Sequence, residues 1–288
     1  GNTTDTYRSD DVYFSQRSGD KVPLDTDRVE DYLYTMSSLD LTNYVTYNAT
    51  EEEIQNCGLD DPEATVQVDY TTEDDDGNDV SGSVTLYVSR DPNERAAAQT
   101  ETDSQSTDDS DAEDEEEEEI TAYARVGDSQ IVYLLDGYDY QALMDVSYDA
   151  LRHTQVLSAD FSTIQQLDFT LEDGRYTITA QVDEEATEDE EDPVLVYTYQ
   201  GEELDISALQ SAIEALSADS FTDEQPTQKE EIRFTAHLDN QNFPTVEVVL
   251  YRYDGESCLA VVDGEPVSLV ARSGAVDLIE AVQAIVLN

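Results

Sequence analysis

The acidic clusters are the residues best suited to bind a metal ion, because carboxylate oxygens are the ligands that calcium takes. Asp74, Asp76 and Gly77 match positions three, five and six of an EF-hand calcium loop. Thr72 and Ser83 occupy positions one and twelve, where the motif requires carboxylates, so the pattern fails there. The sequence therefore predicts a solvated turn rather than a specific metal site.

Catalysis by histidine would have to use His153 or His237, the two histidines of the chain. Neither is accompanied by a GxSxG or HExxH motif, so the sequence does not predict nucleophilic or metal-assisted hydrolysis. Two carboxylates could act as acid and base in a glycosidase, but among 69 acidic residues no pair is selected. We predict a protein without catalytic residues, metal ligands or cofactors, and not an enzyme.

Tyrosine side chains are the candidates for a contact surface. The chain contains 18 of them, many in predicted strands, where an aromatic ring suits a half-buried pleated surface. Tyr87 and Tyr251 occupy matched positions in the repeat described below, and they are the candidate binding residues if they face outward. The other interpretation, which the sequence leaves open, is that both are structural.

Charge restricts the partners. With 69 acidic and 13 basic residues, the formal net charge is −56, which repels phosphate backbones and anionic lipids. We therefore predict no nucleic-acid partner and no direct binding to a membrane surface. Weak binding of divalent cations stays possible, for example at the five glutamates of residues 115–119. Added salt is expected to stabilise the fold by screening self-repulsion over roughly 10 Å at ~0.1 M.

The two cysteines, Cys57 and Cys258, lie at unmatched positions of different repeats. Their spacing resembles no disulfide framework and favours free thiols over a disulfide bond. No apolar run approaches the ~18 residues of a membrane span, and no signal peptide is visible. The polar residues 1–4 are typical of a chain cut just after a removed leader or anchor.

The elements that must position these side chains occur twice. Residues 24–29 recur as 204–209 at an offset of 180, and the pair 86–87 recurs as 250–251 at an offset of 164. Further on, residues 124–126 match 260–262 at an offset of 136. The drop from 164 to 136 equals the 28 residues of 92–119, an acidic tract without aromatic residues. We interpret this tract as a disordered insertion in the first copy.

Periodicity predicts the same elements in both copies. The predicted hairpins pair 66–70 with 84–88, 123–126 with 131–135, 232–238 with 246–250, and 259–262 with 267–270. Helices are expected at 27–39, 138–146 and 276–287, with capping boxes at Asp27-x-x-Glu30 and Ser207-x-x-Gln210. A further hairpin over 167–182 has no visible counterpart in the first copy.

We therefore predict an α+β protein of two tandem related subdomains, each a mostly antiparallel, hairpin-built sheet with flanking helices. The first repeat covers residues 10–155, with the acidic insertion at 92–119, and the second covers residues 160–288.

A family resemblance accompanies this pattern. The segment Cys57-Gly58-Leu59-Asp60-Asp61-Pro62 precedes an alternating stretch at 64–68, and Ala122-Tyr123-Ala124-Arg125 precedes Ile131-Val132-Tyr133. Over roughly residues 24–168 the chain resembles the bacterial family catalogued as domain of unknown function 4340. That family typically carries Tyr-Gly-Leu-x-x-Pro before an alternating strand, and Cys57 stands where its Tyr is more common.

The resemblance implies an envelope protein with its repeats outside the cytoplasm, anchored by an N-terminal transmembrane helix or a lipid. Some relatives accompany transporter-like components linked to gliding motility. We predict a non-catalytic, extracytoplasmic binding or scaffold module with an envelope protein as partner, touching the membrane only through a removed N-terminal anchor. The alternative is a module that binds cations or cell-wall polymer in the cleft between the repeats.

Overall fold

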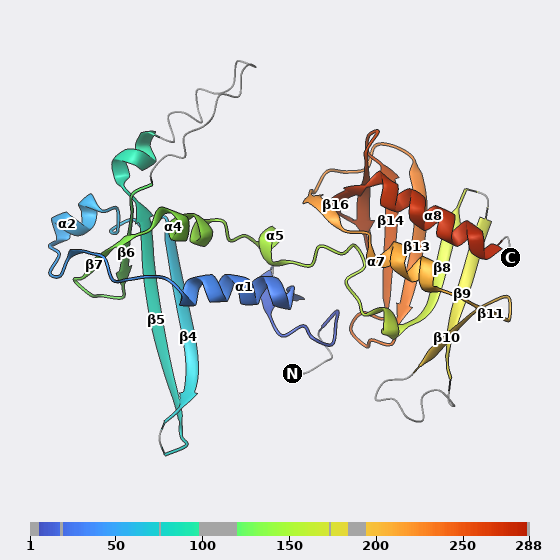
Figure 1. Cartoon of the computed structure of the whole chain (residues 1–288), viewed down its shortest axis with the longest axis horizontal. Helices are drawn as coiled ribbons and strands as arrows, with labels where there is room; N and C mark the ends of the chain where they lie inside the picture. Colours follow the sequence, from blue (N-terminus) through green and yellow to red (C-terminus); the bar gives the residue numbers. More distant parts are fainter. Residues whose placement is uncertain are drawn as a thin grey trace. The chain divides into compact units, whose positions relative to one another are not determined.

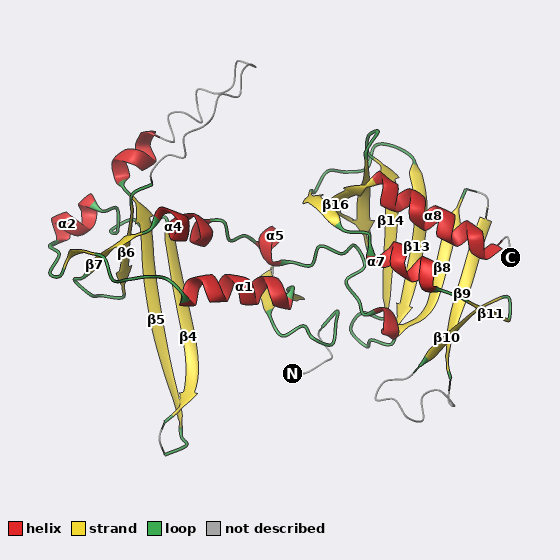
Figure 2. Ribbon diagram, in the orientation of Figure 1, coloured by secondary structure: helices red, strands yellow, loops and turns green. Residues whose placement is uncertain are grey.

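A computed structural model of the chain describes residues 6–17, 20–74, 76–97, 120–172, 174–183 and 194–286. The strands in this part of the chain form three antiparallel sheets accompanied by helices (Figures 1 and 2), which confirms the predicted α+β class. Across the described residues, no helix combines the length and the apolar character that crossing a membrane requires.

One compact unit contains a five-stranded sheet in the order β3-β7-β6-β5-β4 within the described residues. Its strands are β3 (Tyr44–Thr46), β4 (Ala64–Glu73), β5 (Asp79–Arg90), β6 (Ala122–Val126) and β7 (Val132–Leu135). The helices α2 (Glu51–Asn56) and α4 (Gly137–Met144) belong to the same unit. The helix α1 (Thr26–Ser37) belongs to it from Glu30 onward. Alternating side chains of β5 and β6 pack with Tyr140 and Leu143 of α4 to form its core.

The other unit contains a nine-stranded sheet in the order β11-β10-β9-β8-β13-β14-β15-β16-β12, counted over the described residues. Its strands are β8 (Ile164–Leu171), β9 (Gly174–Val182), β10 (Leu195–Tyr199), β11 (Glu202–Leu204), β12 (Ala218–Phe221), β13 (Glu230–Leu238), β14 (Thr245–Arg252), β15 (Ser257–Val262) and β16 (Glu265–Ala271). Helices α7 (Ser207–Glu214) and α8 (Arg272–Val286) lie on one face of this sheet (Figure 2). The hairpin β1 (Phe14–Arg17) and β2 (Asp20–Pro23), the helix α5 (Tyr148–Leu151) and the 3₁₀ turn η2 (Phe161–Thr163) complete the unit.

The core of the nine-stranded sheet centres on two rings. Phe169 of β8 and Phe234 of β13 are paired in register, and their ring centroids lie 5.6 Å apart. Both are buried, in one apolar cluster with Leu278 and Val282 of α8. Period-two alternation of apolar residues in the strands produces this face, and the apolar stripe of α8 covers it.

The strand order repeats. The order β12-β16-β15-β14-β13 in the larger sheet corresponds to β3-β7-β6-β5-β4 in the smaller one. A helix precedes each set (α7 and α1) and another follows it (α8 and α4), and a hairpin comes before each first helix (β10–β11 and β1–β2). The described residues contain no counterpart of β8 and β9 in the smaller sheet. This correspondence agrees with the offsets in the sequence, while the duplication itself stays an interpretation.

The compact units divide the chain differently from the predicted repeats at 10–155 and 160–288. The described parts of residues 1–29 and 148–288 form one unit, and residues 30–147 form the other. Residues up to 29 join the larger sheet's unit because they bind it directly. Arg8 Nε donates to the carbonyl of Ser158 at 2.8 Å, and the Asp25 amide donates to the carbonyl of Leu151 at 3.0 Å.

The capping boxes predicted at Asp27 and Ser207 are wrong. Asp27 lies inside α1, which begins at Thr26, and Ser207 is the first residue of α7, whose N-cap is Ile206, without a side-chain cap. The matched residues Asp25 and Asp205 bind amides of the first turns instead. The carboxylate of Asp25 accepts the N–H of Arg28 at 3.2 Å, and Asp205 accepts the N–H of Ser207 at 3.0 Å. An aspartate can satisfy an otherwise unpaired amide of the first helical turn, and in both helices the aspartate that does so lies two residues before the predicted position.

The structure describes only the first part of the predicted acidic insertion at 92–119. Residues 92–97 are helical, and the rest of the tract, 98–119, lies outside the described residues. A second acidic stretch, residues 184–193, also lies outside the described residues. Cys57 and Cys258 are both buried and free. Burial raises the pKa of the Cys258 thiol to about 11, with a further contribution from the charge of Glu231.

Replacing Phe234 by alanine tests the importance of the paired rings. We expect Phe234→Ala to lower the free energy of unfolding by about 3 to 5 kcal/mol, because the substitution leaves a cavity beside Phe169. Urea denaturation followed by circular dichroism at ~0.15 M salt measures the change. Val182→Thr, at an exposed position of β9, is the control and should change stability by less than about 0.5 kcal/mol. Equal effects of the two variants would contradict the assigned core.

Candidate interaction surface

The β4–β5 hairpin is longer than the sheet to which it belongs. Its ladder runs through ten residue pairs, from Ala64 opposite Val88 to Glu73 opposite Asp79. The neighbouring strand β6 pairs only with residues 86–90 of β5. The far part of the hairpin therefore consists of two strands that extend well beyond β6 (Figure 1).

The apolar face of this hairpin continues the core of its unit. Side chains at alternate positions of paired strands share one face, so Val66 and Leu86 lie on the same side as the residues that follow them toward the turn. Leu86 is buried in the core, and Val66 packs against it. The next side chains on this side are 44% to 47% exposed. We call them the β4–β5 face: Val68, Tyr70, Val80 and Val84.

The positions that match Val84 and Val68 in the larger sheet are covered. Val84 corresponds to Val248 at the offset of 164, and the pairing register makes Phe234 the counterpart of Val68. Val248 and Phe234 are 0% exposed, against 45% and 44% for Val84 and Val68. Similar side chains at equivalent places thus differ in what covers them.

Two structural differences account for this exposure. Helix α8, which packs on β13, has 15 residues, whereas its counterpart α4 has 8. At 1.5 Å per residue, α4 is shorter by about 10 Å. The strand β8, which flanks β13, has no counterpart beside β4 in the described residues. Among the described residues, the β4–β5 face is core-type surface that stays 44% to 47% exposed.

Tyr70 is held against the face rather than projecting from it. A Cβ atom at Gly82, opposite Tyr70 in the ladder, would collide with the ring of Tyr70. The ring therefore lies over the glycine of the neighbouring strand, where there is no side chain to compete for the space. This arrangement gives the middle of the face an aromatic surface.

The hairpin around the face is acidic. Residues 64–89 contain six acidic residues and no Lys or Arg. Asp69 and Glu73 lie on the opposite side of the strands from the face. At the turn, the carboxylate of Asp74 accepts the backbone N–H of Asn78 at 2.8 Å and that of Asp76 at 2.9 Å. These hydrogen bonds turn the carboxylate toward its own backbone, and those from Asn78 foremost lower the pKa of Asp74.

The predicted binding residues Tyr87 and Tyr251 lie elsewhere. Both are half-buried, on strand positions that alternate with those of the core faces. Tyr87 packs against a cluster that includes Cys57, and the guanidinium of Arg125 lies 5.3 Å from its ring centroid. Tyr251 packs against a cluster that includes Leu259. Neither contributes to the β4–β5 face.

The sequence patterns placed the valines of the β4–β5 face in a predicted core hairpin, so they were missed as surface residues. One signal could have found them. The predicted helix at 138–146 is shorter than the one at 276–287, and the hairpin at 167–182 lacks a counterpart. Both differences predict that part of the first sheet has less apolar cover than the second.

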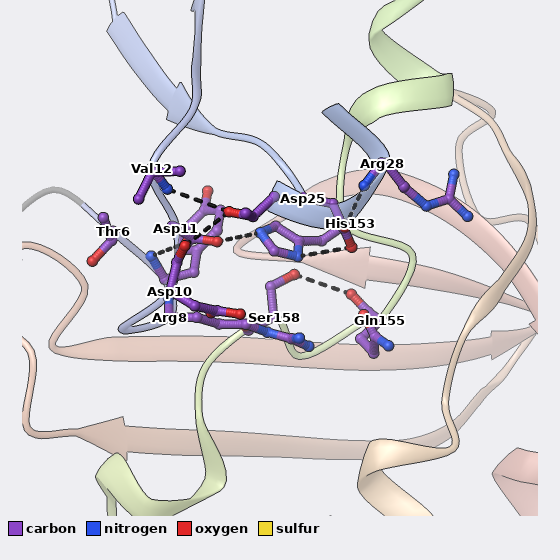
Figure 3. Close-up of polar contacts among 12 residues, drawn as sticks. Thr6, Arg8, Asp10, Asp11, Val12, Asp25, Arg28, His153, Gln155 and Ser158 are labelled. Atoms are coloured by element: carbon purple, nitrogen blue, oxygen red, sulfur yellow. Dashed lines mark hydrogen bonds and ion pairs between the residues drawn. The ribbon is translucent and has the colours of Figure 1, made fainter. Parts of the chain in front are cut away.

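His153 belongs to a buried polar cluster (Figure 3). Its Nε2 lies 2.9 Å from Asp11 Oδ1, and its Nδ1 lies 3.5 Å from Asp25 Oδ2. The side chains of His153 and Asp11 are 5% and 1% exposed. Asp11 also accepts the backbone N–H groups of Tyr7 and Arg8, each at 2.9 Å. Because both ring nitrogens face carboxylates, the arrangement suits fastening the N-terminal segment more than base catalysis.

His237 lies in a different place, on the surface of the larger sheet. Its Nε2 is 2.8 Å from Asp168 Oδ2 on the adjacent strand β8, and both side chains are more than a third exposed. Burial raises the pKa of Asp168, but hydrogen bonds from Thr177, Gln166 and His237 outweigh burial and lower it. No group of three or more His, Cys, Asp or Glu side chains suited to a metal ion occurs in the described residues.

Comparison with known proteins adds no relative: no family model, no curated protein and no solved structure matches the chain. The resemblance to the family catalogued as domain of unknown function 4340 therefore stays a prediction.

The buried cluster predicts a specific effect at Asp11. We expect Asp11→Ala to lower the free energy of unfolding by about 1 to 3 kcal/mol, because it leaves two amides and an imidazole without their acceptor. Hydrogen exchange at the amides of Tyr7 and Arg8 should also become faster. Asp10→Ala, at the neighbouring exposed position, is the control. Unchanged exchange at both amides in Asp11→Ala would show that the carboxylate does not hold the segment.

The exposure of the β4–β5 face predicts unequal responses at matched positions. Threonine keeps the shape of valine but adds a hydroxyl, which is costly where it is buried without a partner. We expect Val248→Thr to lower the free energy of unfolding by about 1 to 3 kcal/mol. We expect Val84→Thr to change it by less than about 0.5 kcal/mol. Urea titrations of the two variants compare them directly, and equal losses would mean that Val84 is covered.

Proposed function

We propose that the chain is a non-catalytic binding or scaffold module that acts outside the cytoplasm and binds another envelope protein through the β4–β5 face. The observation that carries this proposal is the row of core-type side chains exposed at Val68 and Val84. Their counterparts in the larger sheet are completely buried.

Exposed apolar residues are ordinary when they are scattered, so their arrangement matters more than their number. Here they follow one another along one face, in continuity with the core and on a hairpin whose other side is polar. Contiguous apolar surface of this kind is typical of protein interfaces, where its removal from water contributes about 25 cal/mol per Å². A partner covering the face would supply what α8 and β8 supply in the larger sheet.

The absence of a catalytic role is proposed from the lack of hydrolase motifs in the sequence and from His153, whose two ring nitrogens both face carboxylates. The location outside the cytoplasm is proposed from the acidic composition and from the family resemblance. Anchoring at the N-terminus and a link to a transporter-like assembly depend on that resemblance alone. The alternative prediction, a module for cations or cell-wall polymer, gains no supporting observation from the described residues, where Asp74 is engaged by its own turn.

Affinity capture with matched variants tests the proposal. The wild-type chain and two double variants are each immobilised and exposed to a bacterial envelope extract, and the bound proteins are quantified by mass spectrometry. Val68→Asp/Val84→Asp changes the face. Val45→Asp/Val182→Asp is the control, because it places two charges at valines that are exposed elsewhere.

We expect one protein to be captured by the wild type and by the control but to decrease about tenfold or more with the face variant, since burying a carboxylate in an apolar contact is strongly unfavourable. Titration of that purified protein should then give a one-to-one complex. The proposal is wrong if no captured protein depends on the face, or if the purified chain hydrolyses a glycan or a peptide.

A further inference from the structure

The surface proposed for binding has an open edge as well as an apolar face. Within the described residues, β4 has one neighbouring strand, β5. Its counterpart β13 has two, β14 and β8. The strand β8 pairs antiparallel with β13, from Thr170 opposite Arg233 to Ile164 opposite Leu238. The edge that β8 occupies in the larger sheet therefore has no strand on β4 among the described residues.

Hydrogen bonds around β5 show which backbone groups of β4 point to that edge. Gly127 N–H donates to the carbonyl of Thr85 at 2.8 Å, so Thr85 directs its backbone groups toward β6. Direction alternates along a strand, so Val84 and Leu86 direct theirs toward β4, and their partners Val68 and Val66 toward β5. The intervening residues of β4 therefore direct their N–H and C=O groups outward: Gln67, Asp69, Thr71 and Glu73.

The outward-directed residues of β4 occupy the same register as those of β13 that bind β8. Since Val66 pairs with Leu86 and Ile232 pairs with Leu250, Thr71 of β4 corresponds to His237 of β13. His237 lies opposite Gln166 of β8. The open edge thus offers the length and alternation of backbone groups that accept a strand in the second copy.

The negative charges of β4 indicate which kind of strand could pair with its open edge. A second copy of the chain would bring its own Asp69 and Glu73 next to those of the first, and like charges on adjacent strands are destabilising. The net charge of −56 on each chain opposes that contact further. A strand with basic side chains on the side of Asp69 and Glu73 would instead be attracted to β4.

We propose that the partner adds a β-strand to the open edge of β4, antiparallel to it, as β8 does to β13. This inference depends on the proposed function and specifies the chemistry of its partner. The added strand has apolar side chains at alternate positions, which extend the β4–β5 face, and Lys or Arg at the intervening positions, opposite Asp69 and Glu73. Main-chain hydrogen bonds provide affinity, and the two alternating sets of side chains provide specificity.

A synthetic strand supplies the probe. It is a nine-residue peptide of alternating Val and Lys with both ends capped, titrated into the wild-type chain by calorimetry at ~0.15 M salt. A peptide of the same length that alternates Val and Glu is the charge control. A scrambled Val/Lys peptide without alternation is the control for diffuse attraction. We expect saturable binding of the alternating Val/Lys peptide and none of either control.

Two proline variants separate edge pairing from contact with the face. Thr71 and Ser81 are directly opposite each other in the ladder, both are exposed, and their hydroxyl groups lie 3.3 Å apart. Proline at either position removes that contact and one N–H that does not serve the β4–β5 ladder. Thr71→Pro removes the N–H on the β4 edge, and Ser81→Pro removes one on the opposite edge of the hairpin.

We expect Thr71→Pro to weaken binding of the alternating peptide about tenfold, and Ser81→Pro to leave it within about twofold of wild type. Circular dichroism and urea titration check that both variants fold. Thr71→Val, which keeps the N–H, should bind like Ser81→Pro.

Four results would overturn the addition of a partner strand. The two proline variants could weaken binding equally, or the Val/Glu or scrambled peptide could bind as well as the alternating Val/Lys peptide. A concentration-dependent dimer abolished by Thr71→Pro would show that a second copy occupies the edge. If capture of an envelope protein depends on Val68 and Val84 but is indifferent to Thr71→Pro, the proposed function stands and strand addition is wrong.

Discussion

The structure depends on the requirement that the apolar face of a sheet be covered. In the larger sheet, α7 and α8 cover the strands, and Phe169 and Phe234 pack in register beneath them. The smaller sheet has the same strand order, and side chains of α4 pack with Leu86 and Val88. The β4–β5 hairpin continues beyond these residues to the pair of Glu73 and Asp79. Within the described residues, the exposed part of that hairpin distinguishes the smaller sheet from the larger one, and the proposed function follows from it.

Negative charges near this exposed surface oppose its aggregation. A long edge strand with exposed valines is a template for aggregation, and proteins limit this risk with charges on or near the edge. Here Asp69 and Glu73 alternate with the apolar residues, and the whole chain carries a net charge of −56. These negative charges repel a second copy of the chain but attract a strand with basic side chains. The same charges therefore oppose self-association and favour a different protein as partner.

The N-terminal segment shows how a buried polar cluster can determine which parts of a chain belong together. Asp11 and Asp25 precede β1 and α1, and His153 follows α5. Their contacts, with the amides of Tyr7 and Arg8, attach this segment to the unit that contains the nine-stranded sheet. The hairpin β1–β2 consequently belongs to that unit, although by sequence it introduces the first copy.

The amino-acid sequence by itself determined the α+β class, the principal hairpins and the repeated order of elements, because alternation of apolar residues and turn residues are local properties. Val84 and Val248 lie in the same local pattern, and only the tertiary structure decided that one is exposed and the other buried. The exposure of each valine depends on the length of the covering helix, α4 or α8, and on the presence of a flanking strand such as β8. These elements lie far along the chain from the valines. The same reason explains the unit boundary, since His153 and Asp11 are 142 residues apart and no local pattern relates them.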